Sequence, residues 1–187
     1  MKKLLRTLPL LTLVLTGCSL TTVTKTTTRA ITPSATSAPQ KTIYSNASGL
    51  TMTYTNDWKY LEGIYGSLVT FFSPQGSGDL FRENLGVSVE KLPSSLTIQQ
   101  YYDTTKTQLG KLIKDFKELS TEDVVVAGLP AKKIVYEGSQ QSYKLKWEQV
   151  FLIKDKNVYL FTYTATAESF PSYLAQVDEM IKSVKLP

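Results

Sequence analysis

The sequence has no histidine and only one cysteine, Cys18, among its 187 residues. Without histidine there is no Ser-His or Cys-His nucleophile pair, no histidine-bearing zinc site and no imidazole to shuttle protons at neutral pH. A single cysteine also excludes a disulfide within one molecule. From these absences we expect a protein that is not an enzyme and that needs no metal or other cofactor.

Positive charge is also scarce in most of the chain, although the formal net charge is +5. Six of the 21 Lys and Arg residues precede Thr42, so residues 42–187 carry 15 cations against 16 anions. Cations that neutralise phosphates supply most of the non-specific affinity for nucleic acid. A nearly neutral domain has no such excess, and we expect no nucleic-acid partner.

The apolar run near the start, residues 8–15, is too short to span a bilayer, which takes roughly 20 apolar residues. Three basic residues precede it, which is the pattern of a secretory signal peptide. Leu15-Thr16-Gly17-Cys18 follows and resembles the bacterial lipobox, whose cysteine is acylated and becomes the new first residue. We predict a signal peptide at residues 1–17 and a lipid on Cys18 that anchors the protein to a bacterial membrane.

The alternative is an ordinary signal peptide followed by a free cysteine. The diacyl or triacyl group of a lipoprotein anchors firmly, whereas one acyl chain binds only marginally. We therefore expect the membrane to be a partner through Cys18, on its extracytoplasmic face. The organism decides whether that means the outer membrane, the periplasm or the thylakoid lumen.

Residues 18–42 lack the apolar content of a folded segment. Nine threonines lie between Thr21 and Thr42, together with two prolines and little that is apolar. Such a stretch cannot bury enough surface to offset the entropy lost on ordering. We predict a flexible Thr-rich tether at residues 18–42, followed by one folded domain at residues 43–187.

Several segments of the domain have the period of a half-buried strand. Residues 49–54, 68–72 and 85–89 alternate apolar and polar side chains, as early strands of an antiparallel sheet do. Two hairpins follow, one across Ala127-Gly128-Leu129-Pro130 and one joining residues 147–153 to 158–164. The spacing predicts about eight strands.

Two segments have helical spacing. The first begins at Thr97, where Gln100 completes a capping box, and its apolar stripe continues to Leu112 and Phe116. The second begins near Phe170, with a proline allowed in its first turn, and its stripe runs to Val184. Two long helices among many hairpins indicate the α+β class.

Aromatic residues gather in one region and give the candidate site. Core packing accounts for such a set by default, because aromatic side chains bury large areas. The alternative is a partly open apolar pocket that takes a small molecule or lipid. The residues are Trp58, Tyr60, Tyr65, Phe71 and Phe72.

Two pairs of adjacent carboxylates, Glu122-Asp123 and Asp178-Glu179, are the other candidates for chemistry. Calcium sites usually take carboxylates at alternate positions of a loop, and neither pair has that spacing. We expect Asp178 and Glu179 to line the polar face of the last helix.

The order of several short motifs in residues 43–187 resembles the PsbP family and its bacterial relatives, in the superfamily shared with Mog-type Ran-binding proteins. The sequence departs from the family at Tyr54-Thr55-Asn56-Asp57-Trp58, where Tyr-Pro usually precedes the Trp, and in lacking histidine. The motifs are Gly49-Leu50-Thr51-Met52-Thr53-Tyr54, Asn56-Asp57-Trp58, Val69-Thr70-Phe71-Phe72-Ser73-Pro74, Glu83-Asn84-Leu85-Gly86-Val87-Ser88-Val89, Ala127-Gly128-Leu129-Pro130-Ala131, the strand at 157–163 and Ile181-Lys182-Ser183-Val184.

The resemblance implies an α/β/α sandwich with a central, mainly antiparallel sheet and two long helices. It also implies a non-enzymatic assembly or stabilising role, in photosystem II if the organism is photosynthetic. Our first hypothesis is therefore a binding or assembly lipoprotein with a protein partner in a membrane complex. The second is a carrier of an apolar small molecule or lipid.

Overall fold

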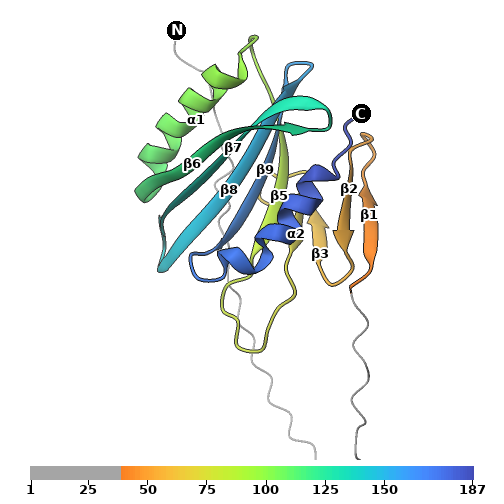
Figure 1. Ribbon diagram of the computed structural model, residues 1–187, viewed down its shortest axis with the longest axis vertical. Helices are drawn as coiled ribbons and strands as arrows, with labels where there is room; N and C mark the ends of the chain where they lie inside the picture. The colour runs from red at the N-terminus through yellow and green to blue at the C-terminus, as the bar shows by residue number, and fades with distance from the viewer. Residues whose placement is uncertain (1–38) are drawn as a thin grey trace, which may run out of the picture.

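The computed structural model describes residues 39–187, so the predicted signal peptide, Cys18 and nearly all of the predicted tether lie outside the described residues. The described part contains nine strands and two helices (Figure 1). In chain order they are β1 (Lys41–Ser45), β2 (Thr51–Thr55), β3 (Lys59–Glu62), β4 (Val69–Phe72), β5 (Asn84–Lys91), α1 (Ile98–Leu112), β6 (Lys114–Val126), β7 (Leu129–Gln140), β8 (Tyr143–Lys154), β9 (Asn157–Thr166) and α2 (Phe170–Lys182).

Seven strands form one antiparallel sheet in the order β3-β4-β5-β9-β8-β7-β6. Strands β6 to β9 follow one another as a meander with two-residue turns. Ala127 and Gly128 both have positive φ, as do Asp155 and Lys156, which is the requirement of a type I′ turn. Both predicted hairpins are thereby confirmed.

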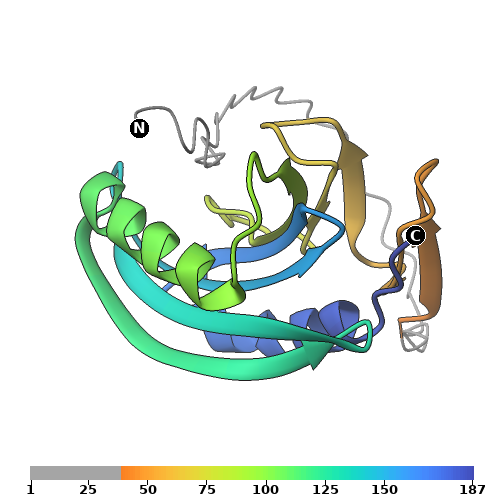
Figure 2. The same ribbon diagram turned by 90° about the horizontal axis from the view of Figure 1, so that it is seen from above.

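The two helices lie on opposite faces of this sheet (Figure 2). One core cluster joins α2 and the β1-β2 hairpin to the sheet, through residues such as Met52, Phe161 and Ile181. The other joins α1 to the sheet, through Tyr101, Phe151 and Leu160. The predicted α/β/α sandwich is therefore confirmed. Within residues 39–187, neither helix has the length and apolar character needed to cross a membrane.

The first helix begins as the sequence predicts. Gln100 N donates to Thr97 Oγ1 at 3.2 Å, and Thr97 N donates to Gln100 Oε1 at 2.9 Å, which makes the capping box. Its end was predicted wrongly, because the chain turns extended at Ile113. Phe116 belongs to β6 and packs on Tyr136, and Leu112 is exposed rather than in the core.

The close approach of β7 helps to fix where α1 ends. A Cβ added at Gly138 would lie 2.9 Å from Lys114 O and against Ile113 Cγ2, so the chain leaving α1 crosses directly over this glycine. The alternation at residues 49–54 also forms a strand, but β2 pairs with β1 in a separate two-stranded sheet rather than in the main one.

The chain that follows α2 completes the arrangement of β2. Thr51 and Lys185 exchange two backbone hydrogen bonds of 3.0 Å, and Thr53 N donates to Ser183 Oγ at 2.8 Å. The β1-β2 hairpin is thus attached to the C-terminal end of α2, near the end of the chain (Figure 1).

Gly138→Ala is expected to destabilise the domain by about 1–3 kcal/mol, because the added methyl group overpacks against Ile113 and Lys114. Urea unfolding followed by circular dichroism measures this. Gly76→Ala is the matched control, since a Cβ at Gly76 meets nothing within 4 Å. Equal stability of the two variants would contradict the close approach.

Candidate functional site

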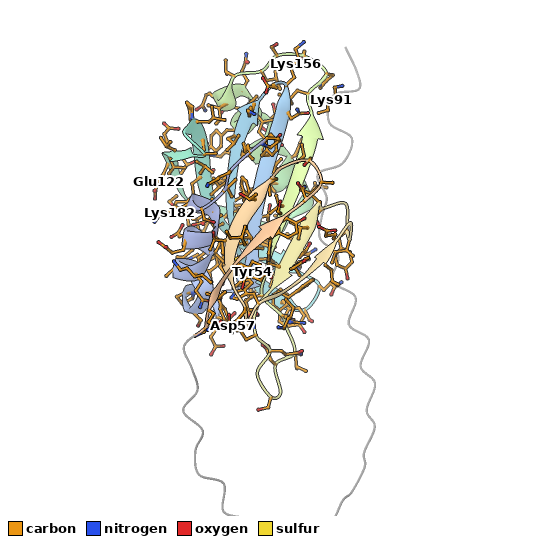
Figure 3. All side chains as sticks on the ribbon, turned by 90° about the vertical axis from the view of Figure 1, so that its right-hand side faces the viewer. Tyr54, Asp57, Lys91, Glu122, Lys156 and Lys182 are labelled. Atoms are coloured by element: carbon orange, nitrogen blue, oxygen red, sulfur yellow. The ribbon has the colours of Figure 1, made fainter. Side chains whose placement is uncertain are left out.

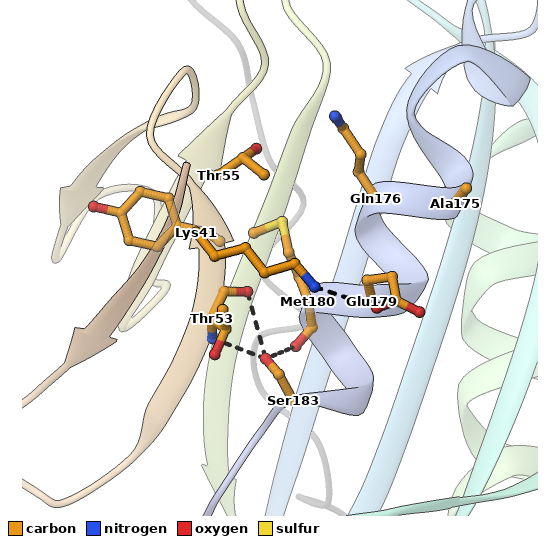
Figure 4. Close-up of a pocket in the computed structure, with 9 residues that line it drawn as sticks. Lys41, Thr53, Thr55, Ala175, Gln176, Glu179, Met180 and Ser183 are labelled. Atoms are coloured by element: carbon orange, nitrogen blue, oxygen red, sulfur yellow. Dashed lines mark hydrogen bonds and ion pairs between the residues drawn. The ribbon is translucent and has the colours of Figure 1, made fainter. Parts of the chain in front are cut away.

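A pocket of about 490 Å³ lies between the β1-β2 hairpin and α2 (Figure 4). The hairpin supplies one wall and one side of the helix supplies the other. Its volume is in the range of pockets that hold small molecules. The lining residues are Lys41, Thr53, Tyr54, Thr55, Ala175, Gln176, Glu179, Met180 and Ser183.

Helical spacing explains the α2 wall. Ala175, Glu179 and Ser183 follow one another at steps of four, which places them along one side of a helix. The stripe beside them, which includes Val177 and Ile181, is buried against the sheet. α2 therefore faces the core with one side and the pocket with the adjacent side, and Met180 contributes to both.

Polar contacts cross the pocket at two levels. Lys41 Nζ reaches from β1 to Glu179 Oε2 at 3.8 Å, and both side chains are exposed (Figure 4). Exposed ion pairs of this kind contribute little to stability, so this one can separate readily. Deeper in, Ser183 Oγ donates to Met180 O at 2.7 Å while accepting from Thr53 N.

Three further polar side chains border the site. Gln176 Oε1 accepts a hydrogen bond of 3.1 Å from Trp58 Nε1. Thr55 Oγ1 is buried and has no hydrogen-bond partner among residues 39–187. Burial, followed by the charge of Tyr60, raises the pKa of Tyr54, so its phenol stays neutral and can donate. The pocket thus combines apolar side chains with a few hydroxyl and amide groups.

The five predicted aromatic residues do not line this pocket. Trp58, Phe71 and Phe72 are buried, whereas Tyr60 and Tyr65 are 43% and 39% exposed. Phe71 and Phe72 are adjacent in β4, so the pleat points them to opposite faces of the sheet and they cannot share one cavity. Trp58 touches the site through two hydrogen bonds to lining residues, from Nε1 to Gln176 and from its backbone N to Thr55 O.

The sequence analysis did not identify the lining residues, because it predicted only a solvated polar face of the last helix at Asp178 and Glu179. The available signal was the four-residue spacing of small and polar side chains in α2, beside the apolar stripe. Glu179 does lie on an exposed face, but that face is the pocket wall. Figure 3 views the molecule from this side, with Tyr54 near the middle and Lys182 and Glu122 at the α2 edge.

A charged cluster lies behind α2, on the side turned toward the sheet. Lys133 Nζ lies 3.6 Å from Glu148 Oε2, 3.9 Å from Asp178 Oδ1 and 3.8 Å from Glu122 Oε2. Burial lowers the pKa of Lys133, but the three carboxylates more than offset this and the net shift is upward. The two acidic pairs seen in the sequence thus each place one member beside the same lysine.

Glu148 is the buried member of this cluster, with its side chain 1% exposed. Its pKa is raised from the ordinary 4.5 to about 7, first by burial and then by the charge of Asp178, with Lys133 opposing both.

Within residues 39–187, no group of three or more acidic, His or Cys residues could hold a metal ion.

Residues 68–183, more than half of the sequence, match the DcrB family. The chain belongs to the DcrB family. None of the curated proteins matches it. Solved structures share the fold of this DcrB-family chain at low sequence identity, which is evidence of the fold alone.

Three such structures illustrate the shared fold. Cyanobacterial PsbP (CyanoP) from Synechocystis has a TM-score of 0.59 at 15% identity, covering 83% of this chain and 98% of its own. LpqN, involved in cell envelope biogenesis of Mycobacterium tuberculosis, has a TM-score of 0.62 at 12% identity, covering 80% of this chain and 92% of its own. The Ran-binding protein Mog1p of Saccharomyces cerevisiae has a TM-score of 0.56 at 8% identity, covering 80% of this chain and 96% of its own. The chain therefore has a Mog/PsbP-like fold.

The raised pKa of Glu148 predicts how stability depends on pH. The folded protein holds the proton on Glu148 more tightly than the unfolded chain does. The stabilisation of the fold by this protonated carboxyl is therefore complete below about pH 4.5 and is lost as pH rises through about 7. Glu148→Gln removes the titrating carboxyl and with it this pH dependence. Between pH 4 and pH 8, the wild type should therefore lose about 3 kcal/mol of unfolding free energy relative to the variant. Chemical denaturation across pH measures this, and a pH-independent difference would contradict it.

Proposed function

We propose that this protein is a non-catalytic binding protein, held at the extracytoplasmic face of a bacterial membrane by lipid on Cys18, that takes an apolar or amphipathic small molecule into the pocket between β2 and α2. The observation that carries the proposal is the pocket itself. Its size suits a small molecule, and hydroxyl, amide and ion-pair groups lie among apolar ones. This agrees with the carrier hypothesis, at a different set of residues from the one predicted.

The contacts of the walls support a site that can admit a ligand. The only ion pair among the lining residues, Lys41 with Glu179, lies exposed across the site and costs little to separate. The base is fixed by Ser183, whose hydroxyl accepts a hydrogen bond from Thr53 N in β2 and donates one to Met180 O in α2. A ligand would therefore displace the exposed contact and leave the deeper one in place.

Two observations support a location in the cell envelope. The first is the basic and apolar start of the sequence followed by Leu15-Thr16-Gly17-Cys18. The second is the fold shared with LpqN, which is described as involved in cell envelope biogenesis. A lipid-linked binding protein at that place would meet amphipathic molecules.

Assembly with a protein partner in a membrane complex is the second candidate. It is favoured by apolar side chains exposed in and after the edge strand β3, namely Tyr60, Leu61 and Tyr65. The photosystem II role implied by PsbP is not part of the proposal, because the sequence matches DcrB and the likeness to PsbP concerns the fold.

Ala175→Trp is expected to block the pocket, because Ala175 lies on the exposed side of α2 at its rim. Protein purified from its native membrane would be extracted and the bound small molecules identified by mass spectrometry. We expect the recovered ligand to fall roughly tenfold or more in the variant.

Ser172→Trp is the matched control, since Ser172 is also exposed on α2 but does not line the pocket. It should retain the ligand. Wild-type protein that carries no apolar molecule, or equal loss in both variants, would refute the carrier role.

Cys18→Ala is expected to abolish labelling by radioactive palmitate and to leave residues 1–17 attached, because the thiol is the group that is acylated. Membrane fractions and intact-mass measurements would show this. Ser19→Ala, one position later, should remain labelled and processed. Normal cleavage of the Cys18 variant would contradict the proposed anchor.

A further inference from the structure

The sheet face opposite α2 carries a group of polar side chains where a core would be apolar. Two cross-strand rows run over β4, β5, β9 and β8. Residues directly opposite each other in an antiparallel sheet point to the same face. One row is Phe72, Asn84, Thr164 and Trp147, and the next is Thr70, Gly86, Thr162 and Gln149.

We call the six small or polar members of these rows the polar floor: Thr70, Asn84, Gly86, Gln149, Thr162 and Thr164. Helix α1 is on this face too, where it lies along β6 and β7 and its side chains reach Phe151 in β8 and Leu160 in β9 (Figure 2). The polar floor therefore lies beside the α1 core and not under the helix.

Three buried acceptor atoms of the polar floor have no hydrogen-bond partner among the described residues. Asn84, Gln149 and Thr164 are 1%, 3% and 4% exposed. Asn84 Oδ1, Gln149 Oε1 and Thr164 Oγ1 have no hydrogen-bond partner among residues 39–187. Native proteins leave few buried polar atoms unpaired, and three neighbouring ones on one face call for a physical reason.

The orientation of both amides is consistent with free oxygens. Asn84 Nδ2 donates to Arg82 O at 3.1 Å, and this carbonyl can only accept, so Oδ1 is turned away from it. Gln149 Nε2 donates to Thr162 Oγ1 at 3.1 Å, and Oε1 is the end of this amide that has no partner among residues 39–187. The amide nitrogens are thus bound within the protein while the oxygens await donors.

Gly86 leaves open space within the polar floor. A Cβ built there meets only Thr162 O, at 3.9 Å, among the described residues. Phe72 and Trp147 end the row that contains Asn84 and Thr164, so apolar rings flank the unpaired acceptors. The six members of the polar floor carry no charge, which disfavours an ionic ligand.

We propose that the polar floor is a second binding site, for an uncharged ligand that presents several hydroxyl or amide N–H donors, the chemistry of a small sugar. Its donors satisfy Asn84 Oδ1, Gln149 Oε1 and Thr164 Oγ1, and its apolar faces lie against the flanking rings. The site is on the opposite face of the sheet from the β2-α2 pocket and is independent of the function proposed for that pocket.

Gly86→Val tests the site, because its Cβ would meet no atom closer than 3.9 Å and its methyl groups would fill the open space at Gly86. The full processed chain, labelled with ¹⁵N, would be titrated with N-acetylglucosamine, glucose and glycerol. We expect saturable shifts of the Asn84 and Gln149 side-chain amide signals with at least one of the three, weakened roughly tenfold or more in Gly86→Val. Gly76→Val, the same change away from the polar floor, should bind normally.

Thr164→Val provides a second test if Gly86→Val folds poorly, since it removes one unpaired oxygen with almost no change of shape. It too should weaken the shifts. Ala175→Trp should leave them unchanged, which separates this site from the pocket. Absence of saturable shifts with all three probes, bound water alone at the three acceptors, or equal binding by Gly86→Val would overturn the proposal.

Discussion

The attachment of β2 to the chain that follows α2 is the constraint on which the rest of the arrangement depends. A two-stranded hairpin is marginal alone in water, and β1-β2 pairs with no strand of the main sheet. The reciprocal bonds of Thr51 and Lys185, with the bond from Thr53 to Ser183, join the first hairpin to the last helix. Without them Leu50 and Met52 would lose their place in the core, and the pocket would lose a wall.

Helix α2 is consequently held from two directions. Its apolar stripe and Asp178 face the sheet, where Lys133 lies among three carboxylates, while Glu179, the next residue, faces the hairpin. The buried carboxyl of Glu148 beside Asp178 makes the sheet side sensitive to protonation. Ionisation there, and a ligand in the pocket as proposed, would therefore act on the same helix from opposite sides.

Local patterns in the sequence predicted much of the fold. The capping box at Thr97, the glycine turn at Ala127-Gly128 and the sandwich layers all appear in the structure. The end of α1 was not predictable, because helical spacing continues to Phe116 and only the distant Gly138 shows that the chain must turn earlier. The pocket was missed for a similar reason, since it depends on a pairing between residues 51 and 185 that no local pattern encodes.

The irregularity of β6 has a consequence for the behaviour of the domain among copies of itself. β6 ends the sheet, and its pairing with β7 shifts register between Lys114 and Lys117 and again between Glu118 and Ser120. Charged side chains and bulges on an edge strand discourage another chain from extending the ladder. The opposite edge, β3, is only four residues long. Neither edge combines length with an unbroken register, so both are poor templates for another copy to extend the sheet.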